Sequence, residues 1–223
     1  MFLGHKISKE GIAPPDDRVK AIEHYPAPQN IKETRRLLGT FQWFSKYIPN
    51  FSTVSHPIRQ LLKAGRKFQW GKEQDAALTK LKESLINSTV LAFPRFDLDF
   101  RLGVDTCCRG IGYCLYQVYP EHEFPPNTPE KDRIRIIRFG SKALSKWQHS
   151  YGPTKLELLG LVTSVLDCAS YIRGKHCIIE CDHQALKPIY QKKLKGAIYE
   201  RWLAILQQFS KLFERMQLCT LKK

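Results

Sequence analysis

The chain has 223 residues, of which 43% are hydrophobic, so it can fold into one or two domains with packed cores. No run of about 18 apolar residues occurs and the first residues lack a secretory signal, so we expect an intracellular protein, cytoplasmic or nuclear, without membrane contact. Seven cysteines without paired spacing predict reduced thiols rather than a disulfide framework. A zinc site at Cys177, Cys181 and His183 is disfavoured, because structural zinc usually needs two paired half-sites.

The net charge of +15 indicates a polyanionic partner, and nucleic acid is the natural candidate. The positive excess is uneven, because residues 183–223 contain nine Lys or Arg and only two acidic residues. The charge alone is explained equally well by a surface that only keeps the protein soluble, since lysine-rich surfaces do this in ordinary proteins.

The first third of the chain predicts a hairpin followed by three helices. Glycines and prolines bound residues 2–12, as in a short hairpin. Apolar residues at helical spacing then predict helices over 16–25, 30–48 and 54–65, the first ended by prolines and the last by a glycine. The first two helices start at residues that favour an N-cap: Asp16 and Asp17, and Asn30 with Glu33 as its capping-box partner.

In the rest of the chain the apolar period changes from helix to strand and back. In chain order the pattern predicts a helix over 76–86, a hairpin of strands over 100–105 and 111–118, a surface loop over 120–133, a strand over 134–139, a helix over 154–172, a strand over 177–181 and a helix over 199–209. A strand reached through a helix is expected to run parallel to an earlier strand. The fold class is therefore α/β, or α+β overall, with a mixed sheet flanked by helices.

Three carboxylates fall where this organisation would bring them together. Asp105 ends the first strand of the hairpin, Asp182 follows the fourth strand, and Glu157 lies near the start of the connecting helix. Phosphodiester hydrolysis by two metal ions needs such a cluster, because Mg²⁺ prefers hard oxygen ligands and two ions must be held close together. Gly103 and Gly112 would leave room for a substrate backbone.

Each acid also has a structural alternative. Thr154 and Glu157 match a capping box, so Glu157 could serve only to bond a backbone N–H. Asp105 could be a turn residue, and Asp182 could be a turn residue or the cap of the next helix. Their joint placement favours the metal site, because turns do not require all three acids at once.

Several motifs follow one another in a characteristic order and spacing. They are Phe2-Leu-Gly-His5, Leu37-Leu38-Gly39, Tyr47-Ile48-Pro49, Phe68-x-Trp70, Val104-Asp105 with Gly110-Ile111-Gly112, Phe139-x-Ser141-Lys142, Tyr151 to Leu159, and Cys181-Asp182-His183. By these motifs, over about residues 2–209, the chain resembles a fragment of the Pol polyprotein of Gypsy-class LTR retrotransposons, in which a reverse transcriptase precedes a ribonuclease H domain.

The resemblance implies a division of the chain into four parts. Residues 1–13 would be the end of the reverse transcriptase palm, 14–65 a small helical thumb, 66–92 a connecting helix, and 93–223 a ribonuclease H-like domain with a mixed five-stranded sheet, truncated at its C-terminus.

The chain departs from the family pattern in two ways. The polymerase aspartate pair would lie upstream of Met1, so we expect no polymerase activity from this chain alone and expect upstream polymerase domains as partners. The family's fourth metal carboxylate has no clear equivalent, although Glu214 could replace it.

The resemblance also implies a function. Asp105, Glu157 and Asp182 would be catalytic and would bind Mg²⁺, with Mn²⁺ as an alternative, in an endonuclease that hydrolyses the RNA of RNA–DNA hybrids. The alternatives are a catalytically inactive nucleic-acid-binding remnant and a remnant that folds poorly.

Nine residues are candidates for nucleic-acid binding: Lys32, Arg35, Arg36, Trp43 and Lys46 on the outer side of the second helix, and Lys187, Lys192, Lys193 and Lys195. Trp43 and Tyr47 could equally pack between helices.

Overall fold

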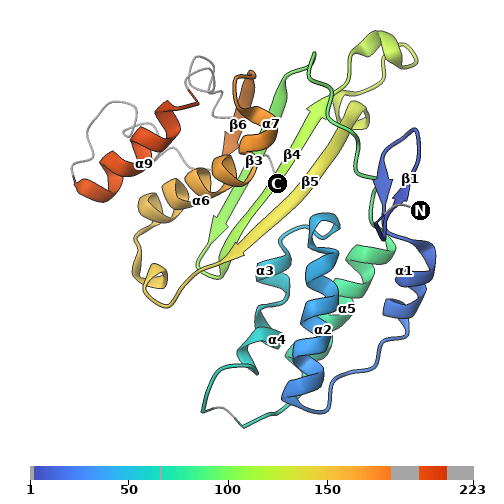
Figure 1. Ribbon diagram of the computed structural model, residues 1–223, viewed down its shortest axis with the longest axis vertical. Coiled ribbons are helices and arrows are strands. Elements are labelled where there is room, and N and C mark those ends of the chain that lie inside the picture. The colour runs from blue at the N-terminus through green and yellow to red at the C-terminus, as the bar shows by residue number, and fades with distance from the viewer. Residues whose placement is uncertain (1–2, 66, 182–195, 210–223) are drawn as a thin grey trace.

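The computed structural model describes residues 3–65, 67–181 and 196–209, in which a helical module lies beside a mixed sheet (Figure 1). An N-terminal hairpin of β1 (Lys6–Ile7) and β2 (Ile12–Ala13) precedes the module, as predicted. The helices of the module are α1 (Asp16–Glu23), α2 (Ile31–Trp43), α3 (Phe51–Val54), α4 (His56–Gln60) and α5 (Lys72–Ile86), with one 3-10 turn at Ser45–Tyr47. Among the described helices, none has both the length and the hydropathy needed to cross a lipid bilayer.

The start of α2 confirms the predicted cap. The Asn30 side-chain oxygen accepts the Glu33 N–H at 2.9 Å, and the Glu33 carboxylate accepts the Gln29 N–H at 2.8 Å. The predicted cap of α1 is wrong, because Pro15 is the N-cap residue and makes no side-chain bond. Asp16 and Asp17 instead form the first turn of α1, where negative charge interacts favourably with the helix dipole.

Two predicted helix lengths in the module are wrong. The helix expected over 30–48 ends at Trp43, after which the chain continues as the 3-10 turn. The helix expected over 54–65 is two short helices, α3 and α4, that meet at Ser55. Pro57 lies in the first turn of α4, and its lack of an N–H removes the bond that would continue one helix into the next.

The sheet consists of β3 (Phe100–Cys107), β4 (Gly110–Val118), β5 (Ile134–Ala143) and β6 (Cys177–Cys181), in the spatial order β5-β4-β3-β6. The β3–β4 and β4–β5 pairs are antiparallel, and β6 is parallel to β3, as predicted for a strand reached through a helix. The expected fifth strand of this sheet does not occur in the described residues, where the other two strands, β1 and β2, form a sheet of their own. Cys177 and Cys181 lie buried in β6 as core thiols.

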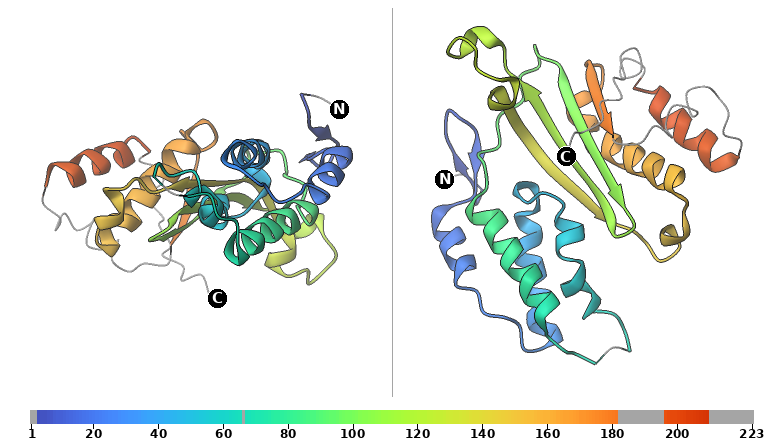
Figure 2. Two further views of the ribbon diagram at one scale, coloured as in Figure 1. Left: turned by 90° about the horizontal axis from the view of Figure 1, so that it is seen from below. Right: turned by 180° about the vertical axis from the view of Figure 1, so that it is seen from behind.

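The two faces of the sheet have different neighbours. On one face, α6 (Pro153–Asp167) packs against β3, with α7 (Ala169–Ile172) and α9 (Ala197–Gln207) beside it; the helix expected over 154–172 is divided at Cys168 (Figure 2). On the other face, α3 contacts β4 and β5. Two hydrophobic clusters result, one within residues 100–209 and one mainly within residues 22–91.

Candidate functional site

Asp105 lies near the end of β3, on the face of the sheet that the helical module contacts. It is exposed, and in the ladder it pairs with Gly112 of β4. Its neighbour Val104 is buried on the opposite face, toward α6. Successive side chains of a strand point to opposite faces of the sheet, so Asp105 and Val104 lie on different faces. A shift of the strand by one residue would exchange the two faces.

The two glycines near Asp105 have different roles. A Cβ atom at Gly112 would lie 1.7 Å from Oδ1 of Asn50, so this glycine gives room to a residue of the helical module and not to a substrate, contrary to the prediction. Asn50 itself adopts a left-handed conformation, with φ of 50°. Gly103 borders a hollow of about 210 Å³ that Asp105 also lines. Gly112 also lines this hollow, but of the two glycines it is Gly103 whose missing side chain leaves open space beside the carboxylate.

Glu157 is half-buried and is the fifth residue of α6. The N-cap residue of α6 is Gly152 and Thr154 lies inside the helix, so the capping-box alternative for Glu157 is wrong. One turn later, a Cβ at Gly160 would lie 2.0 Å from Oγ1 of Thr106. The missing side chain of Gly160 thus lets α6 approach the strand at the residue next to Asp105.

The structure brings Asp105 and Glu157 to the same end of the sheet from opposite faces. The last pair of the β3–β6 ladder among the described residues is Val104 and Cys181, so Asp105 directly follows the described part of this ladder. Asp182 lies outside the described residues, and the described part of the chain holds no group of three His, Cys, Asp or Glu that could bind a metal ion.

Sequence reasoning missed one acidic residue, Glu180, which lies buried in β6 beside Gly103. The Tyr116 hydroxyl donates a hydrogen bond to its Oε2 at 2.5 Å, and Arg101 Nη1 lies 3.6 Å from its Oε1. Burial, and then the neighbouring carboxylate, raise the pKa of Tyr116. The signal was present in the sequence, because a single acid in a buried apolar strand requires a partner.

The residues predicted to bind nucleic acid differ in their exposure. Lys32, Arg35, Arg36 and Trp43 are exposed, whereas Lys46 is half-buried and its pKa is lowered by burial and by Arg138. Lys187, Lys192, Lys193 and Lys195 lie outside the described residues.

The packing alternative for the two aromatic residues holds for Tyr47 and does not hold for Trp43. The Trp43 side chain is 58% exposed and stacks on the His5 ring, with centroids 5.7 Å apart and planes 3° apart. Tyr47 is 1% exposed, and its hydroxyl lies 3.2 Å from Nδ1 of His5. Trp43 is therefore available to a ligand, and Tyr47 packs inside.

The sheet and its helices match a known protein family. The model of the RNase H-like domain found in reverse transcriptase matches residues 95–209, just over half of the chain. The chain belongs to this family. The matched region contains β3, β4, β5, β6, α6 and α9, and therefore both described carboxylates of the candidate site.

Relatives of this RNase H-like chain are retrotransposon polyproteins. The retrovirus-related Pol polyprotein from transposon 297 of Drosophila melanogaster is 32% identical over 209 residues, which cover 93% of this chain and 18% of that polyprotein. The chain spans 14% to 21% of the length of three such relatives, the Pol polyproteins from transposons 412, 297 and opus of Drosophila melanogaster.

Solved structures show the same fold. The foamy viral protease-reverse transcriptase in complex with double-stranded DNA has a TM-score of 0.73 at 16% identity and covers all of this chain and 45% of that one. The same viral protein in complex with an RNA/DNA hybrid has a TM-score of 0.70 at 16% identity, over all of this chain and 30% of that one.

Proposed function

We propose that this chain is a piece of a Gypsy-class retrotransposon Pol polyprotein that hydrolyses the RNA strand of RNA–DNA hybrids endonucleolytically. The observation that carries the proposal is the approach of α6 to β3 at Gly160 and Thr106, which holds Glu157 at the strand end occupied by Asp105. Carboxylates from a strand end and a neighbouring helix suit phosphodiester hydrolysis with divalent cations. The membership of the RNase H-like family supports the same reaction.

The domain division follows from the same proposal. Residues 1–13 are the end of the palm, 14–65 the thumb, 66–92 a connecting helix, and 93–223 the ribonuclease H-like domain. Two separate hydrophobic clusters support a boundary between the helical module and the sheet. Polymerisation requires domains of the polyprotein outside this chain, so primer extension is not expected from it alone.

The donor chemistry of the site fits a divalent cation. Asp105, Glu157 and Asp182 would hold Mg²⁺ or Mn²⁺ through carboxylate oxygens, the ligands that hard cations prefer. Such a cation, when bound, polarises the phosphodiester and makes the attacking water more acidic. Exposed Asp105 is accessible to the substrate backbone beside the open space at Gly103, and half-buried Glu157 is held by the packing of α6.

A cleavage assay tests the proposal directly. The purified chain, with Mg²⁺ or Mn²⁺ and a hybrid labelled on its RNA strand, should produce internal RNA fragments that disappear when EDTA removes the metal. The DNA strand and a single-stranded RNA should remain intact. Binding of the hybrid without cleavage would support the alternative, a catalytically inactive nucleic-acid-binding remnant.

The exposed surface of α2 is proposed to contact the nucleic-acid backbone. Arg36→Glu should weaken hybrid binding at every sequence alike and lower the slope of affinity against salt by about 1, because one cation fewer is paired with a phosphate. Trp43→Ala should weaken binding to single strands, since a base that stacks on an aromatic ring contributes about 1–3 kcal/mol. Fluorescence anisotropy at several salt concentrations measures both effects. An unchanged salt slope for Arg36→Glu would remove this surface from the interface.

A further inference from the structure

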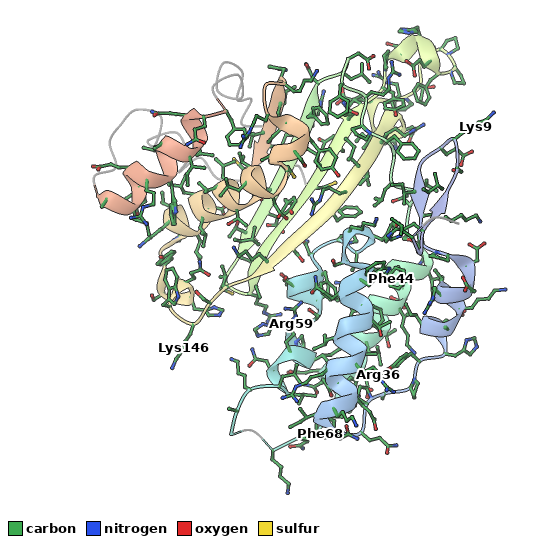
Figure 3. The ribbon with its side chains drawn as sticks, in the orientation of Figure 1. Lys9, Arg36, Phe44, Arg59, Phe68 and Lys146 are labelled. Atoms are coloured by element: carbon green, nitrogen blue, oxygen red, sulfur yellow. The ribbon has the colours of Figure 1, made fainter. Side chains whose placement is uncertain are left out.

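A second polar cleft lies where the helical module meets the turn between β3 and β4. Its volume is about 660 Å³, and the side chains that line it include Thr53, His56, Gln60, Gln74, Lys80 and Arg109. Ser52 and Thr53 of α3 pack against Gly110, which brings α3 and α4 beside the end of the hairpin. Figure 3 labels Arg59 between α4 and this end of the sheet. Residues far apart in sequence therefore build the cleft.

The cleft lies in a positive electrostatic field. Burial lowers the pKa of His56, and so do four basic side chains: Lys63, Arg109, His149 and Arg59. In the described part of the chain, neither Lys80 nor Arg109 forms an ion pair with a carboxylate. Glu73 is the one acidic side chain among the described residues that line the cleft. Cations outnumber acids, so an anion would be stabilised here.

Hydrogen-bond donors accompany the charge. Gln60 Nε2 lies 2.7 Å from His56 Nε2, so the amide donates to this ring nitrogen and the proton of neutral His56 is on Nδ1. His149 Nδ1 lies 2.9 Å from the Cys108 carbonyl oxygen and donates to it, which fixes this ring beside the same turn. The lining also offers the Thr53 hydroxyl and the Gln74 amide, one N–H of which donates to the Pro57 carbonyl oxygen at 3.2 Å. Charged and neutral donors together suit the oxygens of a phosphate group.

We propose that this cleft binds a phosphate of the nucleic-acid backbone and thereby positions an RNA–DNA hybrid beside the candidate active site. The proposal rests on the proposed function. Arg109 follows Asp105 by four residues in the sequence. Asp105 lies two residues, or about 7 Å along the strand, before the end of β3 at Cys107, so the cleft at the following turn is close to Asp105. The described lining contains no Phe, Tyr or Trp on which a base could stack, so it fits the backbone and not a free nucleotide.

Charge reversal at the cleft tests the proposal. Arg109→Glu and Lys80→Glu should each weaken binding of a labelled RNA–DNA hybrid by about fivefold or more at low salt, and lower the salt slope by about 1. Lys131→Glu makes the same change of charge in the 120–133 loop and serves as the matched control, with an expected change below about twofold. Arg109→Gln, together with a thermal melt of every variant, separates lost binding from lost folding.

The outcomes separate this inference from the proposed function. If the parent binds and cleaves the hybrid but the cleft variants lose no more affinity than Lys131→Glu, the cleft proposal is wrong and the active-site proposal stands. Failure of the parent to cleave, with the cleft variants still weakened, would contradict only the catalytic proposal. If inorganic phosphate binds the parent and not Arg109→Glu, but does not compete with the hybrid, the cleft is a free-phosphate site and the backbone assignment fails.

A pH series gives an independent readout. A phosphate beside His56 favours its charged form, so a proton is taken up on binding and hybrid affinity should rise as the pH falls from about 7.5 to about 6. His56→Gln should lose this pH dependence. The variant keeps the other charged and titratable groups around the site, which are Lys63, Arg59, Arg109, His149, Lys80 and Glu73. An equal pH dependence in His56→Gln would contradict contact between His56 and a phosphate.

Discussion

Asp105→Asn should abolish metal-dependent cleavage of the hybrid, with a loss of at least about 100-fold in rate, because residues that only orient a metal ligand already contribute about 10–100-fold. Glu157→Gln should have a similar effect. Asp105→Asn should not lower the stability of the metal-free protein by more than about 0.5 kcal/mol, since its side chain is exposed. Single-turnover cleavage with Mg²⁺ and with Mn²⁺ measures the rates, and a melt without metal measures stability.

A matched control for these changes is Asp132→Asn, whose carboxylate is exposed at the other end of the sheet and makes no hydrogen bond in the described residues. Asp132→Asn should cleave at the parental rate. Divalent cations should raise the melting temperature of the parent and of Asp132→Asn, because they bind the folded state selectively, and should not raise that of Asp105→Asn. The site assignment would be wrong if the Asp105→Asn, Glu157→Gln double variant cleaved the hybrid at the rate of the parent and if divalent cations raised its melting temperature as much.

Phe100→Ala should lower the free energy of unfolding by about 3–5 kcal/mol, the cost of removing a large aromatic side chain from a packed core. Phe100 is fully buried at the start of β3, its ring lies 5.9 Å from that of Phe96, and its N–H donates to the His176 carbonyl. Against a typical total of about 5–15 kcal/mol, this loss is large enough to loosen the strand that carries Asp105. Urea denaturation followed by circular dichroism measures it.

The control for Phe100→Ala is the same substitution at an exposed phenylalanine. Phe93 is 43% exposed and lies outside the strands and helices, so Phe93→Ala should cost less than about 1 kcal/mol. Equal losses for the two variants would mean that the sheet core around Phe100 is not packed as described.

Local sequence predicted the elements well where a short-range signal decides the structure. The cap at Asn30, the hairpin that carries Asp105, and the parallel strand Cys177–Cys181 all appear as expected. The capping bond forms within one turn, and the alternation of a strand is visible in a few residues. Helix ends were less predictable, as at Trp43 and Cys168, because an apolar period continues through a break in the backbone hydrogen bonds.

The sequence by itself determined the family, the strand on which Asp105 lies and the helix that carries Glu157, because motif order and periodicity are properties of the chain alone. Only the tertiary structure decided which side chains meet. Asn50 fills the space at Gly112, Trp43 is exposed while Tyr47 is buried, and the cleft at His56 joins α4 to a turn more than forty residues away. Such contacts depend on how the helical module packs on the sheet, and side-chain packing across that interface leaves no periodic signal in the sequence.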